Sequence, residues 1–177
     1  MKDRAPRNRT LTCSDAELAE LSSGLLRLSA PAHLEVIANR IIHQDYREAH
    51  PFLPPAFADL VILDPPYNLT KNFNGHVFRS KDADTYTSWF DDVVSSLMPL
   101  LGPTATVYAC SDWQTSTLVF PVLNKYFHVR NRITWEREKG RGAKANWKNN
   151  TEDIWFCTIG DDYYFDCLLY TSDAADE

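Results

Sequence analysis

The chain has 177 residues, of which 44% are hydrophobic and 24% charged, the balance of an ordinary soluble globular domain. No apolar run approaches the roughly 18 residues that a membrane span needs. The charged start MKDRAPRNRT is followed by no apolar core of a secretory signal, so we expect a cytoplasmic protein. The net charge of -6 disfavours a polyanionic partner for the surface as a whole.

The four cysteines lie far apart in the chain, at Cys13, Cys110, Cys157 and Cys167. They form no Cys-x-x-Cys pair and no cluster with histidine. The spacing therefore predicts reduced thiols, without a disulfide framework and without a metal site.

The first part of the chain contains short predicted elements separated by prolines. Ser14 and Glu17 form a capping box, and leucines follow at helical spacing, which predicts a helix over 14–28. Ala30-Pro31 breaks the pattern. Further along we expect a short strand over 40–43, a helical turn over 46–50, and a stiff connection at Pro51, Pro54 and Pro55.

Strand and helix patterns alternate from residue 59 onwards, which indicates an α/β fold. Strands are predicted over 59–63, 104–109, 127–135 and 153–158, and helices over 86–100 and 113–125, the second containing Pro121, which can kink it. The last two strands are candidates for a hairpin across a basic loop over 136–148. The run DLVIL has the continuous apolar pattern of a strand buried on both faces of a parallel sheet.

The tetrapeptide Asp64-Pro65-Pro66-Tyr67 directly follows that buried strand. Ligands of open α/β sheets bind at the carboxyl ends of strands. A carboxylate and a proline carbonyl there could accept hydrogen bonds from an exocyclic amine, and Tyr67 offers a face for a base flipped out of a duplex. A simple turn with Asp64 as a turn residue is the alternative, which the position after DLVIL disfavours.

A basic segment stands out in this acidic chain. It contains seven basic residues against two acidic ones: Arg130, Arg132, Arg137, Lys139, Arg141, Lys144 and Lys148 against Glu136 and Glu138. Trp135 and Trp147 flank its centre, and aromatic residues among cations suit nucleic acid. A solvated charged loop is the alternative, and composition leaves the two interpretations open.

Three segments together resemble the amino-methylating (N6-adenine and N4-cytosine) DNA methyltransferases. They are IIHQDYREAHPFLPPAFADLVILDPPYNLTKNF, YTSWFDDVVSSLMPLLGPTATVYACSDW and NRITWEREKGRGAKANWKNNTEDIWFCT, and the resemblance spans residues 14–158. The order of motifs is similar to the permuted class, in which DPPY precedes the glycine loop. The resemblance implies a partial doubly wound, Rossmann-like, S-adenosylmethionine-dependent methyltransferase fold.

The resemblance also implies roles for individual residues. Asp64, Pro65, Pro66 and Tyr67 would be catalytic, and Asp45 and Asp64 would contact S-adenosyl-L-methionine. The target base or DNA would contact Asn68, Lys139, Arg141, Lys144, Lys148 and Glu152. Taken alone, Asp45 suits a helix N-cap, and Glu152 suits a surface or pairing carboxylate. The reaction needs no metal, since the sulfonium methyl is already activated.

The implied activity is methyl transfer to adenine N6 in double-stranded DNA, in a cell that could also hold a partner restriction endonuclease. Asp rather than Ser before Pro-Pro-Tyr favours adenine in this family. An N4-cytosine methyltransferase is the nearest alternative. An RNA guanine methyltransferase would carry a glycine loop before DPPY, and a non-catalytic DNA-binding module would use the basic segment alone.

The sequence lacks the glycine turn that should cradle the cofactor. Its six glycines are Gly24, Gly75, Gly102, Gly140, Gly142 and Gly160, and none forms a Gly-x-Gly turn after a strand. Residues 167–177 resemble the translation of a sequencing-library adapter. We therefore expect an N-terminal helical extension over 1–29, a partial catalytic domain over 30–166 and a non-native tail over 167–177. Such a chain should be inactive, with one sheet edge unpaired and poor solubility.

Overall fold

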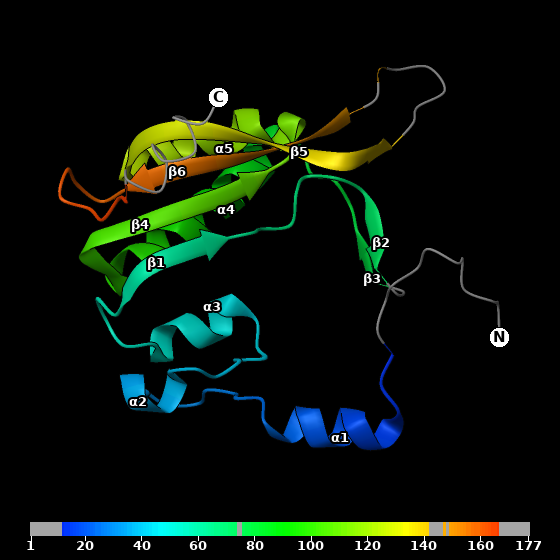
Figure 1. Ribbon diagram of the computed structural model, residues 1–177, viewed down its shortest axis with the longest axis vertical. Helices are drawn as coiled ribbons and strands as arrows, with labels where there is room; N and C mark the ends of the chain where they lie inside the picture. Colours follow the sequence, from blue (N-terminus) through cyan, green and yellow to red (C-terminus); the bar gives the residue numbers. More distant parts are fainter. Residues whose placement is uncertain (1–11, 74–75, 142–146, 148, 167–177) are drawn as a thin grey trace, which may run out of the picture. The chain divides into compact units, whose positions relative to one another are not determined.

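A computed structural model describes residues 12–73, 76–141, 147 and 149–166 (Figure 1). The chain divides into two compact units, residues 1–54 and 55–177. The division falls at Pro54-Pro55, inside the segment predicted to be a stiff connection. Each unit is described by itself below.

The first unit begins with helix α1 (Asp15–Ser23), which is shorter than the predicted helix. The capping box is confirmed, because Glu17 Oε2 accepts the Ser14 backbone N–H at 2.8 Å and Ser14 Oγ accepts the Glu17 N–H at 3.3 Å. The predicted extension to residue 28 is wrong. The chain leaves the helix at Gly24, and Leu26 pairs in a parallel bridge with Ile42, which satisfies its backbone groups in another way.

The rest of this unit consists of single turns: α2 (Leu34–Ile37), α3 (Tyr46–Ala49) and the 3-10 turn η1 (His50–Phe52). The strand predicted over 40–43 is only the bridge at Ile42. Among the described residues of the first unit, the buried apolar ones are Leu28, Ile37 and Ala49. The Gln44 side chain satisfies both backbone polar groups of the buried Leu28. Its Oε1 accepts the Leu28 N–H at 2.8 Å, and its Nε2 donates to the Leu28 carbonyl at 3.0 Å.

The second unit is built on a four-stranded sheet with the order β1-β4-β6-β5. The strands are β1 (Ala58–Leu63), β4 (Leu101–Ser111), β5 (His128–Arg141) and β6 (Asn149–Thr158). β1 and β4 are parallel, whereas β6 is antiparallel to both of its neighbours. The predicted hairpin is therefore confirmed. Its loop is shorter than expected, because residues up to 141 extend β5.

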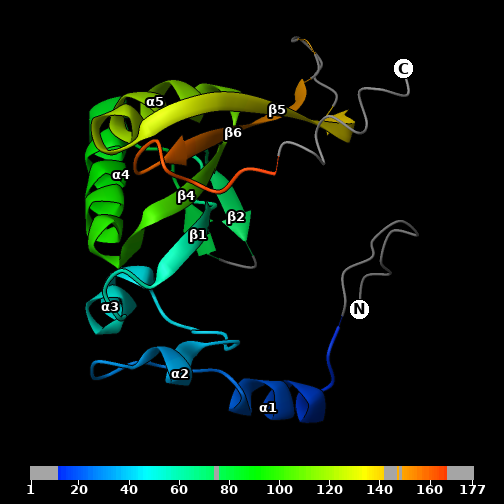
Figure 2. The same cartoon turned by 60° about the vertical axis from the view of Figure 1, so that its left-hand side comes forward.

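Helices α4 (Ala83–Leu97) and α5 (Trp113–Tyr126) cover one face of this sheet, as Figures 1 and 2 both show. The 3-10 turn η2 (Met98–Leu100) follows α4, and α5 runs through Pro121. Lys125 Nζ lies 2.9 Å from Asp91 Oδ1 and joins the two helices. The core of the unit lies under them and includes the fully buried Phe90, Val94, Val107, Val119 and Leu123.

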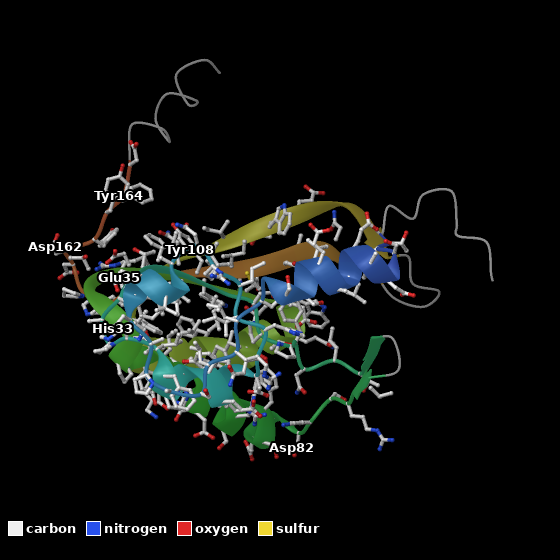
Figure 3. The ribbon with its side chains drawn as sticks, turned by 90° about the horizontal axis from the view of Figure 1, so that it is seen from below. His33, Glu35, Asp82, Tyr108, Asp162 and Tyr164 are labelled. Carbon is white, nitrogen blue, oxygen red and sulfur yellow. The ribbon has the colours of Figure 1, made fainter. Side chains whose placement is uncertain are left out.

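The opposite face of the sheet carries apolar side chains, and the described residues of the second unit place no helix over them. The register places Leu60, Ile62, Tyr108 and Phe156 on this face. Tyr108 (labelled in Figure 3) stacks on Phe156 at a centroid distance of 5.2 Å, and Tyr163 and Phe165 also contact Phe156. Leu60 and Ile62, on the edge strand β1, are 59% and 71% exposed. The prediction that the DLVIL run is buried on both faces is therefore wrong, because β1 has a neighbouring strand on one side only and no described helix of its own unit on this face.

The predicted α/β class is confirmed, although the sheet is parallel only between β1 and β4. A separate antiparallel pair, β2 (Lys71–Phe73) and β3 (His76–Phe78), lies between β1 and α4 in the chain. Within the described residues, no helix has both the length and the apolar character needed to cross a membrane.

The core assignment can be tested at two phenylalanines. Phe90→Ala should lower the free energy of unfolding by about 3–5 kcal/mol, because Phe90 is 0% exposed and its loss leaves a cavity. Phe120→Ala, at a position 40% exposed on α5, should cost clearly less. Denaturant unfolding of both variants measures this, and equal losses would contradict the packing described.

Candidate active site

The Asp-Pro-Pro-Tyr turn leaves the carboxyl end of β1 beside the end of its parallel neighbour β4. Leu63 pairs with Ala109, so Asp64 continues the register next to Cys110. β6 runs in the opposite direction, so its early residues, including Glu152, reach the same edge of the sheet. Asp64 is exposed, Pro65 is buried and Tyr67 is half-buried. The topology thus brings a carboxylate and an aromatic ring to the edge where ligands bind in such sheets.

Asp64, Tyr67, Cys110 and Glu152 form one cluster, called here the acidic corner. Burial, the carboxylates of Asp64 and Glu152, and the Cys110 thiol together raise the pKa of Tyr67. A side-chain interaction between Tyr67 and Asp64 adds the smallest contribution to the same rise of the pKa. The phenol therefore stays protonated at physiological pH.

Cys110 was not predicted as a site residue. Burial first, and then the charges of Asp64 and Glu152, raise the pKa of its thiol. Its position directly after the strand predicted over 104–109 was the available signal, because this is the same edge that Asp64 occupies. The thiol is a neutral neighbour of two carboxylates at physiological pH.

Two helices hold the turn through hydroxyl groups. The Tyr86 hydroxyl, on α4, donates to the carbonyl of Pro66 at 3.0 Å. The backbone N–H of Asn68 donates to Thr115 Oγ1, on α5, at 3.1 Å. Asp112, the N-cap of α5, in turn accepts the Thr115 N–H at 2.8 Å. Sequence reasoning missed both contacts, because the pattern around Tyr86 indicates only an apolar helix face.

The Asn68 side chain joins the two ends of the segment between residues 68 and 81. Its Nδ2 donates to the Lys81 carbonyl at 2.9 Å, and its Oδ1 accepts the Lys81 N–H at 2.7 Å. Thr70 Oγ1 adds a bond from the Ser80 N–H at 3.1 Å. The β2–β3 pair lies between these contacts. The predicted contact of Asn68 with a target base stays a prediction, and its amide already has this structural use.

Asp45 belongs to the first unit and is the N-cap of α3. Its Oδ1 accepts the Arg47 backbone N–H at 2.9 Å, and its Oδ2 lies 3.1 Å from Arg47 Nη2. The side-chain bond from Arg47 is the main cause that lowers the pKa of Asp45. The N-cap interpretation is thus confirmed, and the predicted contact with a cofactor stays a prediction.

Two arginines of the basic segment form hydrogen bonds or ion pairs with neighbouring residues, and the other basic residues lie further along the chain. Arg130 bonds Thr158 Oγ1, the Gly160 carbonyl and Asp161, and Arg132 lies 3.8 Å from Asp153. Lys139 and Arg141 belong to β5, whereas Lys144 and Lys148 lie outside the described residues. Trp135 and Trp147 are 57% and 98% exposed. The first two arginines therefore hold contacts within the sheet, and the exposed tryptophans stand before Arg137 and after Lys144 in the sequence.

The acidic corner has the chemistry of an acceptor site. It offers carboxylate oxygens to N–H donors or to a cation, next to an aromatic face. Among the described residues, no three His, Cys, Asp or Glu side chains gather closely enough to hold a metal ion.

Comparison with protein families decides which kind of protein carries this corner. The DNA methylase family of N6 and N4 methyltransferases matches residues 58–174. The chain belongs to this family. The match covers the acidic corner and the whole four-stranded sheet. It also reaches into the segment predicted to be a tail, whose boundary at residue 167 stays a prediction.

Two curated relatives support the assignment. DNA adenine methyltransferase YhdJ of Escherichia coli K12 is 28% identical over 118 residues, which are 66% of this chain and 40% of the relative. Type II methyltransferase M.BglII of Bacillus subtilis is 26% identical over 141 residues, 72% of this chain and 37% of the relative. The chain thus spans about two fifths of the length of these relatives.

Solved structures share the methyltransferase fold. PvuII DNA methyltransferase (cytosine-N4-specific) superposes with a TM-score of 0.57 and 16% identity, over 72% of this chain and 51% of that chain. TTHA0409 of Thermus thermophilus gives a TM-score of 0.53 with 20% identity, over 70% of this chain and 55% of that chain. The predicted fold class, a partial methyltransferase fold, is confirmed.

The acidic corner can be tested through the reactivity of Cys110. Glu152→Gln removes one of the charges that raise the pKa of this thiol, so Cys110 should be alkylated faster near pH 8. Glu136→Gln is the matched control, because Glu136 instead bonds Asn150 at 2.7 Å. Peptide mapping after timed alkylation reads the rate at Cys110. An unchanged rate in Glu152→Gln would place Glu152 away from the thiol.

Proposed function

We propose that this protein transfers a methyl group from S-adenosyl-L-methionine to the N6 atom of adenine in double-stranded DNA. The observation that carries the proposal is the acidic corner, where Asp64 follows the strand end and Tyr67 lies beside it with Glu152. Membership in the DNA methylase family supports it. The activity belongs to the whole protein, since these residues span about two fifths of the curated relatives.

Asp64 is the acceptor for the reacting amine. Its exposed carboxylate can accept one N6 hydrogen and stabilise the positive charge that develops on the nitrogen during transfer. The proposal assigns the second acceptor to the Pro65 carbonyl. The neighbouring Pro66 carbonyl already accepts the Tyr86 hydroxyl, which supports this assignment. The exocyclic amine must leave the duplex to reach these groups.

Tyr67 would hold the flipped base by stacking, and Glu152 would lie at the same pocket. The hydrogen bonds to the Pro66 carbonyl and from the Asn68 N–H, on either side of Tyr67, support a fixed position of this residue, which lowers the entropic cost of binding a base. Glu152 acts electrostatically on both Tyr67 and Cys110, which supports the proposal that its carboxylate accepts from a donor group of the base.

S-adenosyl-L-methionine supplies an activated, positively charged methyl donor when bound. Two carboxylates in the acidic corner suit such a cation. TTHA0409, a solved structure in complex with S-adenosyl-L-methionine, shares this fold with a TM-score of 0.50 and 19% identity. Asp64 is proposed to contact the cofactor. The contact predicted for Asp45 is a separate proposal, which rests on the family resemblance alone.

Adenine N6 is proposed over cytosine N4. The support is Asp rather than Ser before Pro-Pro-Tyr, together with the relative named as a DNA adenine methyltransferase. The relative named as a type II methyltransferase is the support for a cellular partner restriction endonuclease.

The acceptor role predicts the effect of Asp64→Asn. This change keeps the size of the side chain but replaces one acceptor oxygen by a donor, so kcat should fall by roughly 100-fold or more. Transfer of labelled methyl groups from S-adenosyl-L-methionine to DNA by the complete protein measures it. Asp59→Asn, at an exposed residue of the same strand, is the control. Full activity in Asp64→Asn would refute the role.

The choice of base predicts the product. Nucleoside analysis of DNA methylated by the complete protein should show N6-methyladenine and no N4-methylcytosine. The opposite product would overturn the adenine proposal and leave the family assignment intact.

The basic segment predicts a salt-dependent contribution to DNA binding. Replacing Lys139, Arg141 and Lys144 with Ala should weaken binding and reduce the slope of log affinity against log salt by roughly 3, about one per phosphate contact. Arg130→Ala is unsuitable as a comparison because Arg130 holds the turn after β6. Fluorescence anisotropy at several salt concentrations gives the slope, and an unchanged slope would exclude phosphate contacts from these residues.

A further inference from the structure

We propose that Tyr86 and Thr115 are positioning residues that hold the Asp-Pro-Pro-Tyr turn at the residues before and after Tyr67. Tyr86 holds the Pro66 carbonyl from α4, and Thr115 holds the Asn68 N–H from α5. The inference deepens the proposed function, because the braced turn carries Asp64. The brace itself is a feature of the fold and can be measured without activity.

Tyr86 is a rigid donor. It is 3% exposed, its ring stacks on Phe90 with a centroid distance of 6.4 Å, and it also contacts Trp89 at 5.3 Å. Asp82 (labelled in Figure 3) caps α4 one turn earlier and accepts the Thr85 N–H at 2.8 Å. A buried ring on a capped helix leaves its hydroxyl little freedom, so the Pro66 carbonyl is held at a defined place.

Thr115 is a rigid acceptor. It is 1% exposed, and its own N–H is bonded by Asp112 Oδ1 in the first turn of α5. The hydroxyl is therefore fixed relative to the end of β4, the strand that runs parallel to β1. The Asn68 N–H is a backbone group, so its bond to Thr115 restrains the chain directly after Tyr67.

The two contacts flank Tyr67 in the sequence. Pro66 is held on one side and Asn68 on the other, so the backbone of Tyr67 is fixed at both ends. Displacing a reacting group by about 1 Å can cost about 100-fold in rate. The brace should therefore act on kcat, and substrate affinity should change little.

Side-chain changes that remove only the hydroxyls test the brace. In this chain, Thr115→Val should speed amide hydrogen exchange at Asn68 by about tenfold, the effect of losing one hydrogen bond. Thr115→Ser keeps the hydroxyl and should restore protection. Thr117→Val is the matched control, since the Thr117 hydroxyl bonds only its own helix, at the Gln114 carbonyl. Tyr86→Phe should likewise speed exchange at Asn68, because the Tyr86 hydroxyl holds the Pro66 carbonyl in the same turn. Tyr126→Phe is the control for this variant.

Kinetics of the complete protein give the second measurement. Thr115→Val and Tyr86→Phe should each lower kcat by roughly 10- to 100-fold with KM for DNA and cofactor changed less than about twofold. Thr115→Ser should keep most of the activity. General destabilisation would not lower kcat in Thr115→Val while leaving it unchanged in Thr115→Ser.

The outcomes separate the two proposals. Exchange at Asn68 that is equal in Thr115→Val and Thr117→Val would overturn the brace, as would failure of Thr115→Ser to restore protection. A raised KM with unchanged kcat would also overturn it. If the unmodified complete protein transfers no methyl group, the proposed function fails, and hydrogen exchange alone still decides the brace.

Discussion

The parallel pairing of β1 with β4 is the constraint on which the site depends. Because the two strands end at the same edge, Asp64 and Cys110 come together although they are far apart in the sequence. The antiparallel insertion of β6 then brings Glu152 to that edge from the opposite direction. A shift of this register by one residue would turn Asp64 to the face that carries α4 and α5.

Much of the second unit could be predicted from residue patterns. The strand before Asp64, the helical stripe ending near Gly102, and the hairpin of β5 and β6 each follow from local periodicity and turn residues, although the burial predicted for the strand does not. The Asp-Pro-Pro-Tyr tetrapeptide, whose proposed role is catalytic, was recognisable for the same reason, since its four residues are consecutive. The assignment of the chain to the DNA methylase family rests on the same segments.

Contacts between distant segments could not be predicted in this way. Cys110, Tyr86 and Thr115 reach the turn only through the tertiary arrangement, and each has an ordinary local role as strand end, core ring or helix first turn. In the first unit, by contrast, the leucine pattern predicted a longer helix than the structure has. Leu18 and Leu21 have helical spacing, yet both are largely exposed, because periodicity alone does not provide a surface to pack against. Strand β5 was predicted too short because charged residues weakened its pattern.

The closure formed by Asn68 with Lys81 has a consequence for how such a protein can vary. The Asn68 side chain bonds both backbone groups of Lys81, and the Ser80 N–H adds a bond to Thr70. The ends of the segment between Thr70 and Ser80 are therefore held together by hydrogen bonds. Lengthening a loop that is already closed costs little free energy, about 0.6 kcal/mol for each doubling. Segments of different length could therefore be grafted between Thr70 and Ser80, and the Asp-Pro-Pro-Tyr turn would stay in place.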